Sequence, residues 1–306
     1  MTVPIEEIVQ VEELESKASV ARPVSRRTLI WRRLKGSPQF WFGGLVFAVI
    51  VLWALLGPLL WPISYLERDY SALNQAPSLG HPFGTDTLGY DIFARVMRGL
   101  QISLIIGLIA GPLATLIAGI VGSIAGYIGG VTDKVIAWFI DLLLVLPSFF
   151  IMVIISPLFK GAGWMALTLL LAVFAWMIMA QVIRSQTRSL REREFVKAAR
   201  YMGFGSWSVV TRHIVPNVAS LLIIDATLGV GAVILAETSL SFFGFGVQAP
   251  DVSLGTLIAD GNTAAATRPW LFAFPAGTLV ALLLSLSLLG DSLRDAIDPT
   301  SGVNRG

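Results

Sequence analysis

The stretch GLQISLIIGLIAGPLATLIAGIVGSIAGYIGGVT, residues 99–132, contains no Asp, Glu, Lys or Arg in 34 residues. Because about 20 apolar residues in a helix cross the hydrocarbon core of a bilayer, this stretch is long enough to span one. Two rows of small residues with four-residue spacing run along it: Gly107 and Gly111, then Ala114, Ala118, Gly122 and Gly126. Such rows let helix backbones approach closely in a membrane. We therefore expect a transmembrane helix that is buried among other helices and kinked at Pro112.

Similar apolar stretches recur along the rest of the chain. Of the 306 residues, 55% are hydrophobic and 14% are charged, whereas about 25% of the residues in a soluble domain are charged. Three further stretches lack charge, 36–66, 161–183 and 269–290, and two carry one acid each, Asp141 in 135–159 and Asp225 in 214–236. The sequence therefore predicts an all-α fold, a polytopic membrane bundle of six transmembrane helices.

The positions of Lys and Arg predict how these spans are oriented. An even number of spans places both termini on one side of the membrane. If that side is the cytoplasm, 17 basic residues lie inside and five lie outside, namely Arg68, Arg95, Arg98, Lys160 and Arg268. We therefore expect a multi-pass protein of the plasma membrane, the inner membrane of bacteria, with cytoplasmic N- and C-termini.

Composition divides the chain into four parts. Residues 1–21 are acidic and lack aromatic side chains, which predicts a disordered cytoplasmic tail. Residues 22–96 comprise a basic amphipathic segment, the first span and an external loop. The end of this loop, residues 83–91, is predicted to form a turn in which Asp91 caps a short amphipathic helix. Residues 97–290 form the main transmembrane domain of five helices, and residues 291–306 form a cytoplasmic tail. The basic segment, 22–35, either lies on anionic lipid or serves only as a positively charged flank of the first span.

Several chemistries are excluded by missing residue types. The chain has no Cys and only two His, His81 and His213, which argues against thiolate, zinc and haem sites. Asp86 and Asp91 lack the spacing of a calcium loop. The sequence contains no G-x-S-x-G, H-E-x-x-H or G-x-x-x-x-G-K-[ST] pattern, so neither an intramembrane hydrolase nor an ATPase is expected. We predict that the chain is not an enzyme and holds no cofactor of its own.

The loop between the fourth and fifth spans, residues 184–213, is the only long loop on the predicted cytoplasmic side. Ser189 and Glu192 have the spacing of a capping box, and Gly203 is typical of a helix end. These signals predict a helix over residues 190–202. A second helix is expected to start at a Ser206 cap and to run to Val215, before Pro216 and the fifth span.

The 190–202 helix is predicted to be amphipathic, with one apolar side formed by Phe195, Ala198, Ala199 and Met202. That side could pack back on the chain's own bundle or bind a partner protein. A short cytoplasmic helix has no core of its own to fill, so we favour a partner. DNA is not favoured, because a helix tethered to the membrane at both ends cannot easily enter a groove.

The loop also resembles a known motif. Lys197-Ala198-Ala199-Arg200-Tyr201-Met202-Gly203, with Pro216 thirteen residues after the glycine, resembles the EAA loop (E-A-A-x3-G-x9-I-x-L-P) of binding-protein-dependent ABC importer permeases. Both alanines, the glycine and the proline match. Lys197 replaces the usual Glu, His213 the Ile and Val215 the Leu.

Four further blocks resemble the C-type permease subunits of dipeptide and oligopeptide importers. They are FGTDTLGYD at 83–91, where Tyr90 stands for the usual Arg, DLLLVLP at 141–147, AETSLSFFGFG at 236–246 and LGDSLRDAIDP at 289–299. The resemblance covers about residues 25–300. Importers of dipeptides, oligopeptides, metal chelates and porphyrins share this pattern.

The resemblance implies a type I ABC importer permease fold and a heteromeric complex. The implied partners are a homologous second permease subunit, two ATP-binding subunits that hold ATP and Mg²⁺, an external substrate-binding protein and membrane lipid, with no nucleic acid. The loop helix would couple to an ATP-binding subunit through Phe195, Lys197, Ala198, Ala199, Arg200, Met202, Gly203 and Phe204.

Acidic residues inside a membrane are costly and are therefore candidates for function. Asp141 is expected in the inner third of its span, paired with Arg or Lys or capping a helix. Asp225 lies nine residues beyond Pro216, about 13 Å along a helix, and is the best candidate for the translocation path. Glu237 is expected near the outer end of its span, at a gate or a binding-protein contact.

A secondary transporter or channel not coupled to ATP is the alternative function. Such a protein is expected to show an inverted repeat and its own ion site. No convincing internal repeat is found in the sequence, and the basic loop helix would have no role there. The sequence therefore favours an ATP-driven importer of peptides.

Overall fold

The computed structural model describes residues 26–159 and 161–297, and all of its regular elements there are helices. Five helices are long and apolar enough to cross a membrane, or six spans result if one bent pair is counted as a span. The all-α polytopic fold is thereby confirmed. The elements in chain order are α2 (Arg26–Lys35), α3 (Pro38–Leu60), α4 (Ile92–Ile128), α5 (Gly130–Val145), α6 (Ser148–Ile155), η1 (Ser156–Phe159), α7 (Gly163–Ala175), α8 (Met177–Arg191), α9 (Glu194–Tyr201), α10 (Ser206–Val209), η2 (Val210–Ile214), α11 (Val215–Phe242), α12 (Leu254–Asn262) and α13 (Trp270–Ile297).

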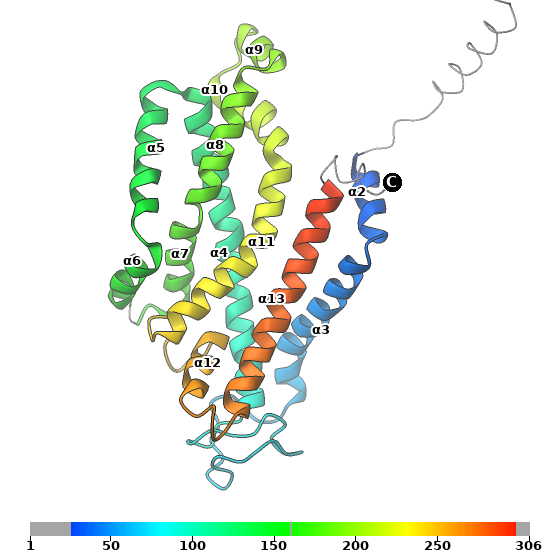
Figure 1. The fold of residues 1–306 in the computed structure, drawn as a ribbon, viewed down its shortest axis with the longest axis vertical. Helices are drawn as coiled ribbons and strands as arrows, with labels where there is room; N and C mark the ends of the chain where they lie inside the picture. The colour runs from blue at the N-terminus through cyan, green and yellow to red at the C-terminus, as the bar shows by residue number, and fades with distance from the viewer. Residues whose placement is uncertain (1–25, 160, 298–306) are drawn as a thin grey trace, which may run out of the picture.

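The helices run between two ends of an elongated bundle (Figure 1). One end, at the top of Figure 1, holds α2, α9, α10 and the last turns of α13, and we call it the α9 end. The other end holds α12 and residues 61–91, and we call it the α12 end. The basic residues assigned to the cytoplasm that fall in α2, α8, α9 and η2 lie toward the α9 end. The chain thus begins and finishes its described part at the same end, as an even number of crossings requires.

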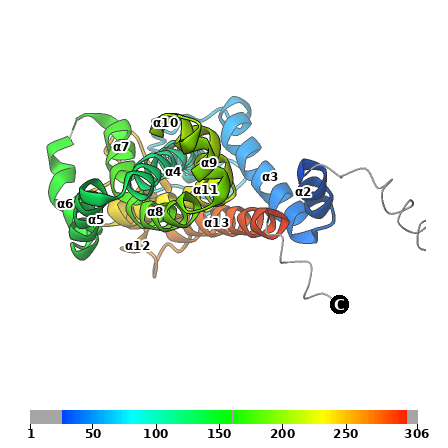
Figure 2. The same cartoon turned by 90° about the horizontal axis from the view of Figure 1, so that it is seen from above.

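Helix α4 lies at the centre, with α8 and α11 as its main neighbours (Figure 2). Its small residues explain this position, as the sequence predicted. In the middle of α4, Gly107 and Gly111 face Val230 of α11. Near its end, Gly122 and Gly126 face the backbone of α8. The helix continues through Pro112 without a break.

A methyl group at Gly122 should destabilise the bundle. A Cβ there would lie 2.6 Å from the carbonyl oxygen of Ala180 and 2.9 Å from the Cβ of Ile183. Because backbone must move to make room, we expect Gly122→Ala to lower the free energy of unfolding by about 1–3 kcal/mol. Gly277→Ala on α13 is the matched control, since nothing lies within 4 Å of its Cβ. Thermal unfolding of the purified membrane protein measures the difference, and equal midpoints for both variants would contradict the packing.

The third predicted span is not one straight helix. Helices α5 and α6–η1 meet at an angle of 81°, with Leu146 and Pro147 between them. Proline disfavours helical backbone at the residue before it, and Leu146 is indeed extended, with φ −81° and ψ 125°. The six predicted transmembrane helices are therefore five long helices and, if the bent pair is counted as one span, a sixth.

Two predicted boundaries fall inside helices. The division between residues 96 and 97 lies within α4, because Asp91 caps that helix and accepts a hydrogen bond from the backbone N–H of Ala94. The predicted tail from residue 291 begins within α13, which continues to Ile297. The acidic tail, residues 1–21, lies outside the described residues. Helix α2 packs against α13 and α3, and its contact with lipid stays a prediction.

Candidate functional site

The predicted coupling helix is α9, at the α9 end of the bundle (Figure 1). It ends at Tyr201, and Gly203 follows with φ +83°, a conformation that glycine adopts without strain. The N–H of Gly203 donates to the carbonyl of Arg200, and the N–H of Phe204 donates to the carbonyl of Ala199. This pair of hydrogen bonds is a Schellman motif, which confirms Gly203 as the residue that ends the helix.

The start of this helix differs from the prediction. Ser189 lies inside α8, and α9 begins only at Glu194, with Arg193 in the cap position and no side-chain cap. Ser189 and Glu192 therefore do not form a capping box, because α8 continues to Arg191 and a turn at residues 192–193 separates the two helices. The predicted helix over residues 190–202 is corrected to Glu194–Tyr201.

The predicted second loop helix is continuous with the fifth span. Ser206 is the first residue of α10, not a side-chain cap, and α10, η2 and α11 together form one helix from Ser206 to Phe242. Residues Val210–Ile214 form a π-helical turn. Pro216 has no backbone N–H to donate, and such π turns are typical where the regular ladder is interrupted. Pro216 thus sits within a continuous helix and does not mark a separate entry.

Helix α9 has two apolar faces with different surroundings. Val196 and Ala199, the latter 1% exposed, pack with Tyr127 of α4 and with Val209 and Ile214. This corrects the assignment of Ala199 to a partner surface: α9 folds back on its own bundle through Ala199 and through Val196, which the sequence interpretation did not single out. The other face remains exposed, and it includes Phe195, Ala198, Tyr201, Met202 and Phe204.

The remaining loop residues make α9 basic at its surface. Lys197 and Arg200 are exposed. The ammonium group of Lys197 lies 3.1 Å from a carboxylate oxygen of Glu192, and this hydrogen bond lowers the pKa of Glu192. Lys197 thus has an acidic partner within the loop itself, at the turn that precedes α9.

A second cluster joins α5 and α8 close to this loop. Both carboxylate oxygens of Asp133 accept hydrogen bonds from the guanidinium of Arg184, the Nη2–Oδ2 distance being 3.0 Å. Arg188 lies 4.0 Å from the same carboxylate. Sequence reasoning missed this ion pair, because the two residues are 51 positions apart and each appeared only as part of a charged flank.

Asp225 lies about halfway along the continuous helix Ser206–Phe242, at a cavity that is open to one side, where Leu146 and Ile178 are exposed. We call it the central cavity. The cavity has a volume of about 590 Å³ and is lined by α4, the α5–α6 bend, α7, α8 and α11. The hydroxyl of Thr115 donates a 2.6 Å hydrogen bond to Oδ2 of Asp225. Asp141 does not line this cavity, and its partner is Gln181, whose Nε2 donates to it at 2.6 Å. The expected Arg or Lys partner of Asp141 is therefore corrected to Gln181, since Arg184 binds Asp133 instead.

Glu237 is fully buried, with no exposed surface. Its carboxylate accepts hydrogen bonds from Ser103 at 3.2 Å and from Ser241 at 2.5 Å. Ser241 in turn accepts a hydrogen bond from the hydroxyl of Ser253 at 3.2 Å, and Ser103 accepts from the N–H of Leu254. The carboxylate joins α4, α11 and the start of α12. Because Glu237 has no exposed surface, the expected contact with a binding protein is corrected to an internal group between these helices. Its role at a gate stays a prediction.

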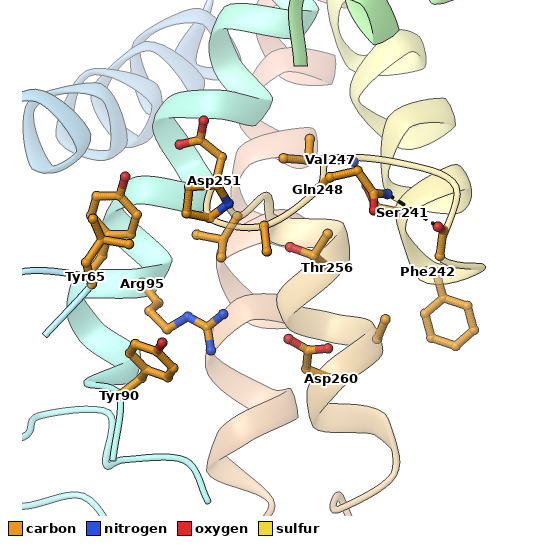
Figure 3. A pocket seen from close by; sticks show the side chains of 16 residues that line it. Tyr65, Tyr90, Arg95, Ser241, Phe242, Val247, Gln248, Asp251, Thr256 and Asp260 are labelled. Atoms are coloured by element: carbon orange, nitrogen blue, oxygen red, sulfur yellow. Dashed lines mark hydrogen bonds between the residues drawn. The ribbon is translucent and has the colours of Figure 1, made fainter. Parts of the chain in front are cut away.

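The α12 end contains a second cavity, also of about 590 Å³ (Figure 3). Arg95 from α4 and Asp260 from α12 both point into it. Burial raises the pKa of Asp260, and the nearby Arg95 opposes this shift. Arg95 itself is held by Asp86, 2.9 Å away, and by the ring of Tyr90.

The FGTDTLGYD block shapes this end of the molecule. Gly84 and Gly89 have φ values of +74° and +82°, and residues that carry a side chain rarely adopt such values. Oδ1 of Asp86 accepts the backbone N–H groups of Leu88 and Tyr90. The block thus forms the predicted turn, and Asp91 caps a helix as expected, although that helix is the full-length α4 and not a short one. No group of three or more His, Asp or Glu side chains suited to a metal gathers in residues 26–159 and 161–297.

Two sequence models of protein families match this chain. The sequence model of the binding-protein-dependent transport system inner membrane component family matches residues 118–302. A second model, for the N-terminal transmembrane domain of oligopeptide transport permease C, matches residues 25–77. The first match contains the bend at Pro147, α9, Asp225 and Glu237.

Individual relatives cover most of the chain. The oligopeptide transport system permease protein OppC of Mycobacterium tuberculosis is 50% identical over 278 residues, 90% of this chain and 96% of the relative. OppC of Escherichia coli K12 is 40% identical over 257 residues, 83% and 85% of the two chains. A putative peptide permease protein of Brucella suis is 37% identical over 264 residues, 85% and 87%. The chain therefore belongs to the binding-protein-dependent transport system inner membrane component family and is a C-type permease subunit.

Proposed function

We propose that this chain is the C-type membrane subunit of an ATP-driven importer of peptides. Its similarity to oligopeptide permeases supports the substrate class. The complex would contain a homologous second permease, two ATP-binding subunits and an external substrate-binding protein. ATP and Mg²⁺ would be held by the ATP-binding subunits, since this sequence has no phosphate-binding loop.

One observation carries the proposal: the two-faced packing of α9. The inner face, Val196 and Ala199, is built into a cluster with residues of α4 and η2, and the outer face exposes Phe195, Ala198 and Met202. A partner bound to the outer face would therefore move α4 and α11 together with α9. This is the arrangement that rigid-body switching between two transporter states needs.

Charge supports the orientation in the proposal. The α9 end carries the loop residues Lys197, Arg200 and Arg212 together with Arg32 and Lys35 of α2. Basic residues are enriched on the cytoplasmic side of membrane proteins. We propose that the α9 end faces the cytoplasm, where ATP-binding subunits are found, and that the α12 end faces the binding protein.

Reconstitution tests the proposed function. The purified four-component membrane complex in liposomes, supplied with binding protein, is expected to take up radiolabelled tri-alanine only when ATP is available to the ATP-binding subunits. This chain alone in liposomes is the control and should take up no peptide with ATP or with a proton gradient. Gradient-driven uptake by the chain alone would instead establish the alternative, a secondary transporter.

A further inference from the structure

The central cavity exists because small residues face it from two helices. Gly111 and Ala114 contribute from α4, and Gly229, Ala232 and Ala236 contribute from α11. A Cβ on Gly229 would find its nearest neighbour 3.8 Å away, at the Cα of Gly111. The resulting space of about 590 Å³ is within the range of small-ligand sites, about 300–1,000 Å³. These residues therefore leave room for a short peptide segment.

Asp225 is the only charged residue among those that line this cavity, all of which lie in the described part of the chain. Thr115 donates to Oδ2 of its carboxylate, which orients the group and leaves Oδ1 able to accept another hydrogen bond. Within residues 26–159 and 161–297, Asp225 takes part in no ion pair. A carboxylate inside a membrane is costly unless a positive group pairs with it. The cavity is thus electrostatically suited to a cation.

The rest of the lining is apolar and adaptable. Met152 of α6 and Met177 and Met179 of α8 face the cavity beside Leu143 and Phe174. Methionine side chains repack around ligands of different shape and are common at promiscuous binding surfaces. Such a lining accepts varied side chains, whereas a single carboxylate selects for one constant positive group. In peptides with a free N-terminus, that constant group is the N-terminal ammonium.

Resting on the proposed function, we infer that Asp225, positioned by Thr115, binds the N-terminal ammonium of the peptide in transit through the central cavity. The ammonium offers three N–H donors and a full charge, and charge-assisted hydrogen bonds to a carboxylate are the stronger kind. The peptide's side chains lie against the methionines and the small residues of α4 and α11.

Two peptides that differ only in the ammonium test this inference. Binding of tri-alanine amide and N-acetyl-tri-alanine amide to the detergent-solubilised membrane complex is measured without the binding protein, so that its own selectivity does not enter. The wild-type complex should bind tri-alanine amide at least about tenfold more tightly than the acetylated peptide, a difference of about 1.4 kcal/mol. Asp225→Asn should remove this preference by weakening only the peptide with the ammonium. Asp225→Glu should keep it.

The control is Asp141→Asn, the same change at an acid on α5 that lies outside the cavity, and it should leave the preference unchanged. Equal affinities of wild type for the two peptides, or an equal loss of both peptides in Asp225→Asn, would overturn the inference. Thermal unfolding of each variant establishes that it is folded. A failure of the proposed function is distinguished from a failure of this inference by the uptake assay, in which the wild-type complex would then show no ATP-dependent uptake of tri-alanine.

Discussion

Asp in place of Ala198 should separate this subunit from the ATP-binding subunits of the proposed complex. Ala198 lies on the exposed apolar face of α9, between Phe195 and Met202. A charge there must be desolvated when a partner covers the face, which is costly for an unpaired carboxylate. We expect the fraction of ATP-binding subunit that co-purifies with the tagged chain, and ATP-dependent tri-alanine uptake, each to fall at least about tenfold, equivalent to about 1.4 kcal/mol.

Two further variants make this expectation specific. Ala266→Asp, in the exposed segment after α12 at the opposite end of the molecule, introduces the same charge and should retain the ATP-binding subunits. Ala199→Asp places the charge in the cluster with Val196 and Ile214, so it should also lower the unfolding temperature, which Ala198→Asp should not. Full retention of the ATP-binding subunits by Ala198→Asp would show that the exposed face of α9 is not the docking surface.

Loss of the Asp133 carboxylate should weaken the contact between α5 and α8. In Asp133→Ala, the guanidinium of Arg184, whose side chain is 23% exposed, loses two charge-assisted hydrogen bonds. Hydrogen bonds to charged groups contribute about 1.5–3 kcal/mol each, and partial exposure to solvent reduces this figure. We expect a loss of about 2 kcal/mol in the free energy of unfolding, measured by thermal unfolding of the purified protein.

Charge exchange distinguishes a specific pair from a general effect of charge. Asp133→Arg alone should be the most destabilised variant, because the new positive charge lies beside Arg184 and Arg188 and is repelled by both. Combining it with Arg184→Asp should recover stability, and the double-mutant cycle gives the coupling energy. Arg188→Ala is the matched control: its side chain is 62% exposed and lies 4.0 Å from Asp133, so little change is expected. A cycle with no coupling would contradict the pairing.

The sequence predicted most of the features that depend on neighbouring residues. The charge-free stretches correspond to membrane-length helices, and the small residues of residues 99–132 bury α4 as expected. The turn at 83–91 and the helix end at Gly203 were also predicted correctly. Each of these depends on local backbone preference or on length, which neighbouring residues determine directly.

Features that depend on how helix faces meet were predicted less well. Periodicity predicts one apolar side on α9, but the bundle covers Ala199 and leaves Met202 70% exposed. The spacing of Ser189 and Glu192 predicts a capping box, but Ser189 lies inside α8, which continues to Arg191. Periodicity shows that a helix has an apolar side, and only the position of the neighbouring helices decides which part of that side is already covered.

Composition and local patterns by themselves determined that this chain crosses a membrane several times and to which family it belongs. Only the tertiary structure shows that the bend at Pro147 lines the cavity. Only the tertiary structure also shows which residues bind Asp133, Asp141 and Glu237, and that Thr115 binds Asp225 across 110 positions of sequence. The reason is that burial and hydrogen bonding of a side chain depend on residues distant in the chain. Their approach follows from the packing of whole helices and not from the sequence around either residue.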